Sequence, residues 1–453
     1  MTRAADTGPD HWPAALAEGF ATIPREGCWW VALSGGFDSV LLLHLAKVWL
    51  ASLPHSPNLQ AVHINHQLHP DAPQWTEFCR ALCDRLGVPL TERTVDVASN
   101  GEGLEDAARQ ARYRIFEACL APGDALLQAH HADDQAETVL FRLMRGSGVD
   151  GLAGIPPQRA LGEGRLYRPL LALSRQQLKA LPEARDLDWC EDPSNEDRSL
   201  DRNYIRHAIL PPLTERWPAA ISRIAHSADH CRETGELLRE LAWMDLALLV
   251  VKGTAGLDCT QLQRLTPARR FNALRAWLEQ QGARPPGELK LREGVEQLLH
   301  AGEDRQPELR WGDWSLRRYR GVLYLVPEVD ALPTTVSWNG QSELLWGSQR
   351  LLAMPNQKEG IRESAWPLEV RPRAGGEYLP AADGRPGKPL KKWLQEEGIP
   401  PWERDRLPLF WKGDELVAVG ACWIAPAFRA GGGESGRVIS SYVPGFERLT
   451  LDV

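Results

Sequence analysis

Apolar and polar segments alternate along the first third of the chain in the way that strands and helices alternate in an α/β domain. Short apolar runs of strand length lie between longer segments in which apolar residues recur every three or four positions. This alternation predicts a parallel β-sheet with helices on both faces. The predicted strands are residues 29–33, 59–64, 90–95 and 125–129, and the predicted helices are residues 39–51, 72–86, 104–120 and 133–144.

The pattern changes after this region and predicts further domains. A helical pattern with heptad-like apolar spacing occupies much of residues 210–299, and residues 309–326 have the pattern of a β-hairpin. Short strand-like runs and loops follow, before a last module with its own apolar pattern. We therefore divide the chain into a first α/β domain (residues 1–215), a mainly helical domain (216–330), a linker region (331–365) and a small α+β C-terminal domain (366–453).

The composition is that of an ordinary soluble globular protein, with 43% hydrophobic and 25% charged residues among 453. No apolar run is long enough to cross a bilayer, and residues 1–13 lack the features of a signal peptide, so we expect a cytoplasmic protein. The eight cysteines include no C-x-x-C pair, which predicts neither disulfides nor an iron–sulfur cluster. The net charge of −8 argues weakly against nonspecific binding of nucleic acid but allows a local basic face.

The segment that joins the first strand to the first helix has the composition of a phosphate-binding loop. It reads Ser34-Gly35-Gly36-Phe37-Asp38-Ser39, and it lies where the free N–H groups and positive dipole end of a helix attract an anion. The glycines allow close approach of the backbone, and the serines offer hydroxyl donors. The carboxylate of Asp38 is compatible with phosphate only through a metal ion. The loop has no lysine and is not a Walker A loop; a turn that merely caps the helix is the alternative.

Polar side chains also follow the second and fourth predicted strands, at the end of such a sheet where ligands bind. His63 and His66 close the second strand, and their rings suit hydrogen bonds to a nucleotide or to loop backbone better than a metal site. After the fourth strand, Asp133 is predicted to cap the helix. Asp134 and Glu137 share a helical face, and this carboxylate pair calls for Mg²⁺ or a substrate ammonium unless it is a solvated helix start.

Three arginines outside these loops are further candidates for anion binding. Arg109 and Arg112 share a face of the third helix, and two guanidiniums near the edge of the sheet suit phosphate or carboxylate. The alternative is a solvated helix in which Glu105 pairs with Arg109. Arg145 lies in a glycine-rich segment, residues 143–154, that is either an active-site lid or a linker.

Eight motifs occur in one order along the first half of the chain: SGGFDS, HINHQL, RYRIF, HHADDQAET, RGSGVDGLAG, RPLL, EDPSNED and RNYIR. The first resembles the pyrophosphate loop of the N-type ATP pyrophosphatases, which split ATP between its α- and β-phosphates. The full set resembles the bacterial tRNA(Ile)-lysidine synthetases. Three segments near the C-terminus, residues 371–377, 390–394 and 399–409, resemble the C-terminal domain of that family, so the resemblance extends over most of the chain.

The resemblance implies a catalytic domain with the parallel-sheet, adenine-nucleotide α-hydrolase-like (PP-loop) fold. It implies that ATP, with Mg²⁺, adenylates the carbonyl oxygen of the wobble cytidine in a CAU-anticodon tRNA(Ile) and that pyrophosphate leaves. An amine of free L-lysine then displaces AMP and forms lysidine through a new C–N bond. The modified tRNA reads AUA instead of AUG and is charged with isoleucine instead of methionine.

The resemblance also assigns roles to individual residues. Asp38 would hold Mg²⁺, and Arg112 would approach ATP and the activated intermediate. Asp134 and Glu137 match the acidic pair that holds the ammonium group of lysine. The residues expected to take part in catalysis are Asp38, Arg112, Asp134, Glu137 and Arg202, with Arg206 as the second choice for the last, and those expected to bind the nucleotide are Ser34, Gly35, Gly36, Phe37, Asp38, Ser39, His63 and His130.

The C-terminal domain is expected to grip tRNA. Residues 371–412 contain nine lysines and arginines against six aspartates and glutamates, so this segment is locally positive. Trp393 and Trp402 suit base stacking, although their apolar surroundings favour core packing. The sequence does not set the oligomeric state and leaves a homodimer open. The candidate phosphate contacts are Lys391, Lys392, Arg404 and Arg406.

Three other functions share some of these features. A tRNA thiolation enzyme on a similar fold would depend on cysteine pairs, which this chain lacks. A small-molecule ligase of the amidotransferase type would need an ammonia source, and the sequence shows neither an N-terminal cysteine nucleophile nor a second catalytic domain. A catalytically inactive tRNA-binding protein is the third alternative, and the presence of Asp38, Asp134 and Glu137 argues against it.

Overall fold

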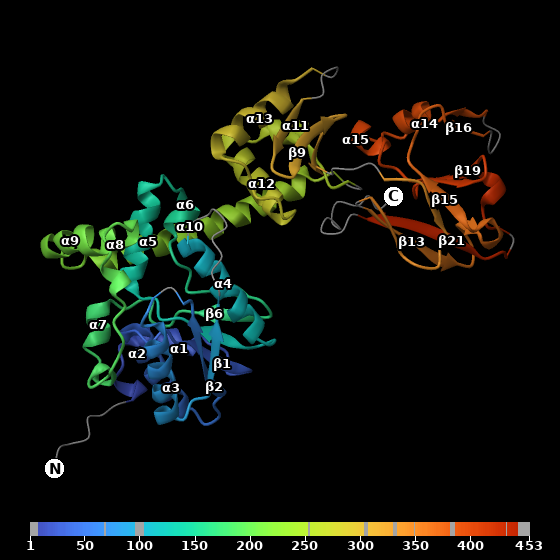
Figure 1. The fold of residues 1–453 in the computed structure, drawn as a ribbon. Coiled ribbons are helices and arrows are strands. Elements are labelled where there is room, and N and C mark those ends of the chain that lie inside the picture. The colour runs from blue at the N-terminus through green and yellow to red at the C-terminus, as the bar shows by residue number, and fades with distance from the viewer. Residues whose placement is uncertain are drawn as a thin grey trace, which may run out of the picture. The chain divides into compact units, whose positions relative to one another are not determined.

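The computed structural model describes residues 8–67, 69–95, 104–251, 254–302, 307–328, 333–347, 349–380, 386–431 and 433–442. The chain divides into two compact units, Met1–Glu236 and Leu237–Val453 (Figure 1). Within the described residues, each helix is too short or too polar to span a bilayer.

A six-stranded sheet with the order β3-β2-β1-β4-β6-β5 forms the centre of the first unit. Neighbouring strands are parallel from β3 to β6, and the edge strand β5 runs antiparallel to β6. The chain moves outward from β1 to β3 and then returns to β4, so the strand order reverses between β1 and β4. Sheets of this kind bind ligands at the carboxyl ends of the strands that flank such a reversal. The strands are β1 (Cys28–Ala32), β2 (Asn58–Asn65), β3 (Leu90–Thr94), β4 (Ala125–Leu127), β5 (Gln158–Leu161) and β6 (Gly164–Tyr167).

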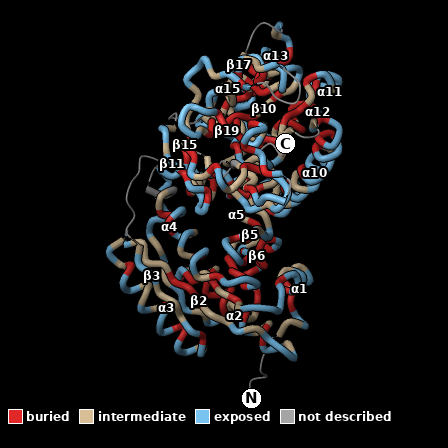
Figure 2. The backbone as a smooth tube through the Cα atoms, turned by 90° about the vertical axis from the view of Figure 1, so that its right-hand side faces the viewer, coloured by how far each residue is buried: buried red, intermediate tan, exposed pale blue. Residues whose placement is uncertain are grey.

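Helices cover both faces of this sheet. Trp29 and Val31 of β1 pack with α1, α2 and α3 in one hydrophobic cluster, whereas Trp30 and Ala32 pack with Phe116 of α4 in another. Successive side chains of a strand point to opposite faces, so the apolar run of β1 is covered on both sides. Figure 2 shows buried residues gathered around β2 and α2. The helices are α1 (Ala14–Ala21), α2 (Phe37–Ala51), α3 (Ala72–Leu86), α4 (Leu104–Cys119), α5 (Ala132–Met144), α6 (Val149–Leu152) and α7 (Arg175–Lys179).

The alternation of strands and helices predicted for residues 29–144 is confirmed, with boundaries that agree within two residues. The fourth strand is shorter than predicted and ends at Leu127 rather than at residue 129. The chain leaves the sheet there because Gln128 and His130 turn toward the side chain of Arg168, which donates to both of them.

A run of short helices closes the first unit against α5. The segment passes from α8 (Asp201–Tyr204) through a π-helical turn (Ile205–Ile209) into α9 (Leu210–Arg216). Ile205 and Leu210 pack with Ala132 and Ala136 of α5 in a small hydrophobic cluster. Single π-helical turns are rare and occur frequently at functional sites, so this one directs attention to the side chains around it. The chain then enters the long helix α10 (Ala220–Leu249).

The second unit begins with helices that pack on a four-stranded sheet of order β7-β10-β9-β8. Its core contains Trp277 and Leu278 of α12 together with Leu316 of β9 and Leu323 of β10. The β-hairpin predicted for residues 309–326 is confirmed as part of a three-stranded meander. These elements are β7 (Leu257–Asp258), α11 (Cys259–Arg264), α12 (Pro267–Gln280), α13 (Glu288–His300), β8 (Glu308–Trp311), β9 (Trp314–Tyr319) and β10 (Val322–Pro327).

The region expected as a linker, residues 331–365, supplies strands to the sheets of the C-terminal part. Strand β11 pairs with β15, and β13 and β14 pair with β21, which lies about eighty residues further along the chain. The segment therefore differs from a linker because its hydrogen-bonding partners are distant in sequence. The strands are β11 (Val336–Trp338), β12 (Leu344–Trp346), β13 (Gln349–Asn356), β14 (Ile361–Arg362), β15 (Leu368–Arg371), β16 (Tyr378–Leu379), β17 (Lys388–Pro389), β18 (Leu409–Lys412), β19 (Glu415–Val419), β20 (Trp423–Ile424) and β21 (Gly436–Tyr442), and the helices are α14 (Leu390–Glu396) and α15 (Pro401–Arg404).

Residues of α15 and the turn after it attach the C-terminal part to strands β9 and β10. The ring of Trp402 packs edge-on against Tyr319 and Tyr324. Arg404 donates to the hydroxyl of Tyr319 at 3.1 Å, and Arg406 donates to a backbone carbonyl of β10 at 3.2 Å. The two arginines expected to contact tRNA phosphates are therefore engaged inside the protein. Trp393 is buried, in agreement with the core role favoured by its surroundings, and Lys391 and Lys392 are exposed.

The carboxyl group of Glu403 in this junction makes the second unit sensitive to pH. Burial raises the pKa of Glu403 from 4.5 to about 7, although the guanidinium of Arg406 opposes the shift. The protonated form is therefore favoured in the folded state, and this stabilisation is lost as the pH rises from 4.5 through 7. We expect Glu403→Gln, which cannot ionise, to be more stable than the wild type by a margin that widens between pH 4.5 and pH 7 and stays constant above. Thermal unfolding at stepped pH measures this margin.

The exposed Glu415 of β19 provides a control in the same unit. We expect Glu415→Gln to follow the wild-type pH dependence of stability. A margin for Glu403→Gln that stays the same from pH 4.5 to pH 8 would contradict the prediction.

Candidate active site

The predicted phosphate loop and the start of α5 meet at the carboxyl ends of β1 and β4. The imidazole of His131, directly before α5, lies with Nε2 at 3.7 Å from Oδ1 of Asp38 in the loop. The two segments are almost one hundred residues apart in sequence but leave adjacent strands, because β1 and β4 pair in parallel. The sheet thus brings together the two polar motifs that we predicted separately.

The backbone of the loop is shaped by glycine and by two serine hydroxyls. Gly35 has φ of +89°, a conformation that glycine adopts without strain. The Ser39 hydroxyl donates to the carbonyl of Gly36 at 2.9 Å and accepts from the Ser34 N–H at 3.1 Å. The Ser34 hydroxyl lies 3.0 Å from that of Ser39. Buried Ser39 therefore fixes the shape of the loop, and exposed Ser34 keeps a hydroxyl near the first N–H groups of α2.

The segment around residue 190 covers the loop on its other side. The ring of Phe37 is buried and packs edge-on against Trp189 at 5.2 Å between ring centroids. The N–H of Cys190 donates to the carbonyl of Gly35 at 2.9 Å. The side chain of Phe37, one of the residues expected to bind the nucleotide, therefore anchors the loop, and what it can offer a ligand is its backbone N–H.

Charges of opposite sign alternate where the loop faces α5. Burial opposes a charge on His131, but the carboxylates of Asp133, Asp38 and Asp134 outweigh it and raise the pKa of His131 to about 10. The imidazole is thus a cation at neutral pH. Oδ1 of Asp38 is buried without a hydrogen-bond partner among the described residues, and Arg175 approaches it at 3.7 Å. A carboxylate oxygen held in this way is a suitable ligand for a cation.

Asp134 and Glu137 face two arginines from the helical segment that closes the unit. Arg202 donates to Glu137 at 2.9 Å and to Asp134 at 3.0 Å. Arg206 donates to Glu137 at 2.6 and 3.0 Å, and its distance to Asp134 is 3.5 Å. The Glu137 side chain is only 1% exposed, whereas that of Arg202 is 39% exposed. Arg202 lies in α8 and Arg206 lies in the π-helical turn that follows, and both guanidiniums reach the same carboxylate pair.

This arrangement modifies the expectation of an uncompensated acidic pair. The carboxylates share a face as predicted, but two guanidiniums already balance their charge. Burial works against ionisation of Asp134, yet the positive charges of His131 and Arg202 lower the pKa of its carboxyl. Asp134 is therefore held as an anion, and the hydrogen bonds from both arginines fix the positions of the two carboxylates.

The predicted helix cap at Asp133 is wrong. The N–H of His131, which precedes the helix, is bound by Oδ2 of Asp134 at 3.0 Å. Asp133 instead accepts a hydrogen bond from the N–H of Arg175 at 2.8 Å, and so ties α5 to α7. Sequence spacing could not separate these neighbours, because either carboxylate can reach the first turn of the helix.

The two histidines expected to bind the nucleotide are engaged with the protein. His63 is buried, with Nδ1 at 2.9 Å from the carbonyl of Leu33 and Nε2 at 3.1 Å from the hydroxyl of Thr76. It therefore supports the chain that leads into the phosphate loop. His130 accepts at Nδ1 from Arg168 at 2.9 Å, and burial lowers its pKa to about 3. His130 is thus neutral and is held in one orientation.

Arg109 and Arg112 have different neighbours although they share a face of α4. Burial, and after it the positive charge of Arg112, lower the pKa of the His66 imidazole to about 4. Arg112 therefore lies near His66, which directly follows β2. The guanidinium of Arg109 instead stacks on the ring of Tyr113. Arg112 is exposed, and its role toward ATP stays a prediction.

Sequence reasoning missed His131 and Arg175 and ranked Arg206 second. The motif HHADDQAET contains both histidines, and the prediction names only His130. The structure places the second, His131, between the loop and the acidic pair. The spacing of four residues between Arg202 and Arg206 was a usable signal for a shared face, whereas nothing local marks Arg175.

Three family models match the chain. A PP-loop domain matches residues 14–213, a TilS substrate binding domain matches residues 257–324, and a TilS substrate C-terminal domain matches residues 368–440. Among solved structures, the chain resembles a tRNA thiolase from Methanococcus maripaludis at 18% identity, over 48% of this chain and 78% of that one, with a TM-score of 0.39. A likeness of this level carries no weight in the assignment.

Curated relatives match over nearly the whole chain. The tRNA(Ile)-lysidine synthase of Alkalilimnicola ehrlichii is 44% identical over 429 residues, which cover 93% of this chain and 96% of the relative. The tRNA(Ile)-lysidine synthase of Pseudomonas aeruginosa is 43% identical over 89% of this chain and 92% of the relative. Identity of this extent, across all three matched domains, shows that the chain belongs to the tRNA(Ile)-lysidine synthase family.

Proposed function

We propose that this chain uses ATP to adenylate the wobble cytidine of a CAU-anticodon tRNA(Ile) and then joins free L-lysine to the activated carbon. The products are lysidine-containing tRNA, AMP and pyrophosphate. The observation that carries the proposal is the contact between the phosphate loop and the acidic pair, through Asp38, His131 and Asp134. This contact supports a triphosphate site and an ammonium site on the two sides of the region outside the carboxyl ends of β1 and β4, hereafter the crevice.

The loop supports the first half-reaction. The first N–H groups of α2 and the Ser34 hydroxyl would bind phosphate oxygens, and the cation His131 lies beside them. Asp38 would hold Mg²⁺, which neutralises phosphate charge when bound. Asp38 fits this role because its carboxylate oxygen Oδ1 is buried and has no hydrogen-bond partner among the described residues. Such a site needs one carboxylate because the substrate phosphates and water supply the remaining ligands.

The acidic pair supports the second half-reaction. Asp134 and Glu137 would attract the ammonium group of lysine, and Arg202 would keep both carboxylates in position. The charges of His131 and Arg202 lower the pKa of Asp134, so its carboxylate is suited to binding an ammonium and is a poor proton acceptor. Its role is therefore to position the lysine amine against the activated carbon rather than to deprotonate it.

The proposed partners are tRNA(Ile) and L-lysine, and the proposed location is the cytoplasm, where tRNA is modified. A homodimer is compatible with this chemistry, since the residues that carry it all belong to the first unit of one chain. The chain's Lys391 and Lys392 remain proposed contacts to tRNA phosphate, because both are exposed on α14.

Incubation with ATP, Mg²⁺, radiolabelled lysine and an unmodified CAU-anticodon tRNA(Ile) transcript tests the function. We expect label in acid-precipitated RNA that requires ATP and is lost when the wobble cytidine is replaced.

Asp38→Asn should reduce AMP formation about 100-fold or more, because the phosphate charge loses its neutralising ion, while tRNA binding is retained. Asp84→Asn, at an exposed position of α3, is the control. AMP formation without labelled RNA would point to another nucleophile.

Glu137→Gln tests the lysine site separately. Removal of one negative charge should raise the KM for lysine about tenfold or more and leave the KM for ATP unchanged. The same change weakens the contacts of two guanidiniums, so we expect the free energy of unfolding to fall by about 2 kcal/mol. Steady-state kinetics with each substrate varied in turn and chemical unfolding are the measurements. An unchanged KM for lysine in a folded variant would refute the assignment, and Glu18→Gln in α1, which is exposed, controls for charge removal elsewhere.

A further inference from the structure

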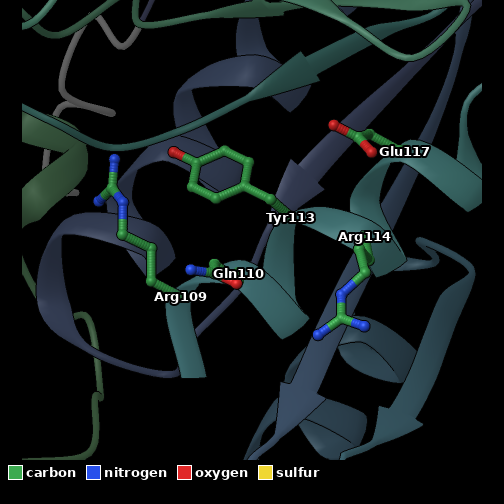
Figure 3. A pocket seen from close by; sticks show the side chains of 5 residues that line it. All are labelled: Arg109, Gln110, Tyr113, Arg114 and Glu117. Atoms are coloured by element: carbon green, nitrogen blue, oxygen red, sulfur yellow. The ribbon is translucent and has the colours of Figure 1, made fainter. Parts of the chain in front are cut away.

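A cavity of about 410 Å³ lies along one face of α4, outside the groups assigned above. It is lined by Arg109, Gln110, Tyr113, Arg114 and Glu117, whose spacing along the helix places them on a common face. Figure 3 shows the Arg109 guanidinium and the Tyr113 hydroxyl directed to the same side, with Arg114 and Glu117 on the other side of the ring.

Two guanidiniums from different elements stack on the ring of Tyr113. The Cζ atom of Arg109 lies 5.1 Å from the ring centroid, and that of Arg159 lies 4.6 Å from it. Arg159 pairs with Leu166 across β5 and β6, so both side chains are on the α4 face of the sheet. The Tyr113 ring therefore contacts two cations from different elements, one from helix α4 and one from the edge strand β5.

Two further arginines extend this positive cluster toward the crevice. Arg168 is buried and donates to His130, to Gln128 and to the carbonyl of Pro156. Burial lowers the pKa of Arg168 to about 10, and the charges of Arg159 and Arg109 contribute in the same direction. Arg142 donates to two carbonyls of the glycine-rich segment, at Gly151 and Gly154, and the charge of Arg109 adds to the burial that lowers its pKa.

The described contacts of these arginines contain no carboxylate. Their partners are backbone carbonyl oxygens, one imidazole, one amide and the Tyr113 ring. Four guanidiniums that repel one another, of which Arg109 lines the cavity, have an unfavourable electrostatic energy that an anion would relieve. In a chain with net charge −8, this concentration of arginines without a carboxylate among their described contacts indicates a binding site for an anion.

The position of the cluster favours a particular anion. It lies on the α4 face of the sheet, whereas the phosphate loop leads into α2 on the opposite face. It also borders the crevice, since Arg168 holds His130 and the next residue, His131, contacts Asp38 and Asp134. A phosphate bound here would thus be separate from the triphosphate in the loop but close to the reacting groups.

We propose that Arg109 and Arg159, joined by Tyr113, bind a backbone phosphate of the RNA strand that carries the reacting nucleotide. The planar donors of arginine match a phosphate group, and a contact to the backbone would fix the register of the strand without reading its sequence. The proposal rests on the proposed function, because it takes tRNA as the substrate. It assigns the phosphate to RNA rather than to ATP, and the test separates these two sources.

The affinity of a fluorescein-labelled CAU anticodon stem–loop RNA, measured by anisotropy at several salt concentrations, tests the proposal. We expect Arg109→Gln and Arg159→Gln each to weaken binding about tenfold at moderate salt and to reduce the slope of log K against log salt by about one. The KM for ATP should stay at the wild-type value. Arg165→Gln is the matched control, because Arg165 is exposed on β6 and its side chain leaves the other face of the sheet.

A second RNA identifies the contacted group. Neutral methylphosphonate linkages on either side of the target cytidine should weaken wild-type binding as much as Arg109→Gln weakens binding of the unmodified RNA. Arg109→Gln should then cause no further loss of affinity for the RNA with these linkages.

Equal affinity of Arg109→Gln, Arg159→Gln and Arg165→Gln for unmodified RNA would overturn the proposal. A raised KM for ATP with unchanged RNA affinity would overturn it as well and assign the cluster to the nucleotide. Failure of the wild type to bind the stem–loop would instead count against the proposed function.

Discussion

The ionic contact of Asp134 and Glu137 with Arg202 and Arg206 is the interaction on which the site depends. It joins the helix that follows β4 to the helical segment that closes the first unit, at residues nearly seventy positions apart. Buried charges of this kind contribute little net stability, because desolvation offsets much of their attraction. Loss of one member is costly, however, since its partners remain as uncompensated charges. The contact therefore serves chiefly to fix geometry, and the charge of Arg202 helps to keep Asp134 ionised in a place where burial alone would favour protonation.

Contacts between opposite charges also fix the groups in the rest of the crevice. From the loop toward the closing helices, the charge sequence is carboxylate at Asp38, imidazolium at His131, carboxylate at Asp134 and guanidinium at Arg202. Each group lies beside neighbours of opposite sign, so a shift of one group would leave its neighbour without a counter-charge. A crevice built in this way has fixed regions of positive and negative potential before substrates arrive, which is the condition for electrostatic stabilisation without reorganisation.

Arginines in this protein have two distinct uses that their local sequence does not separate. Arg404 and Arg406 lie in a locally basic segment but bind inside the protein, to Tyr319 and to the backbone of β10. Arg109 of α4 and Arg159 of the edge strand β5 are fifty residues apart in sequence but converge on Tyr113. Position in the folded chain, rather than local net charge, therefore decides which arginines can meet a nucleic acid.

The sequence by itself determined the α/β order of the first unit, because burial on both faces of a sheet leaves a legible apolar pattern in each strand and helix. It also located the phosphate loop, and helical spacing placed Asp134 and Glu137 on one face. Only the tertiary structure decided which charges meet. The pairing of the acidic pair with Arg202 and Arg206, the place of His131, and the pairing of β13 with β21 all join residues far apart in the chain. Such contacts depend on strand order and helix packing, which no local spacing encodes, so they became visible only in the folded chain.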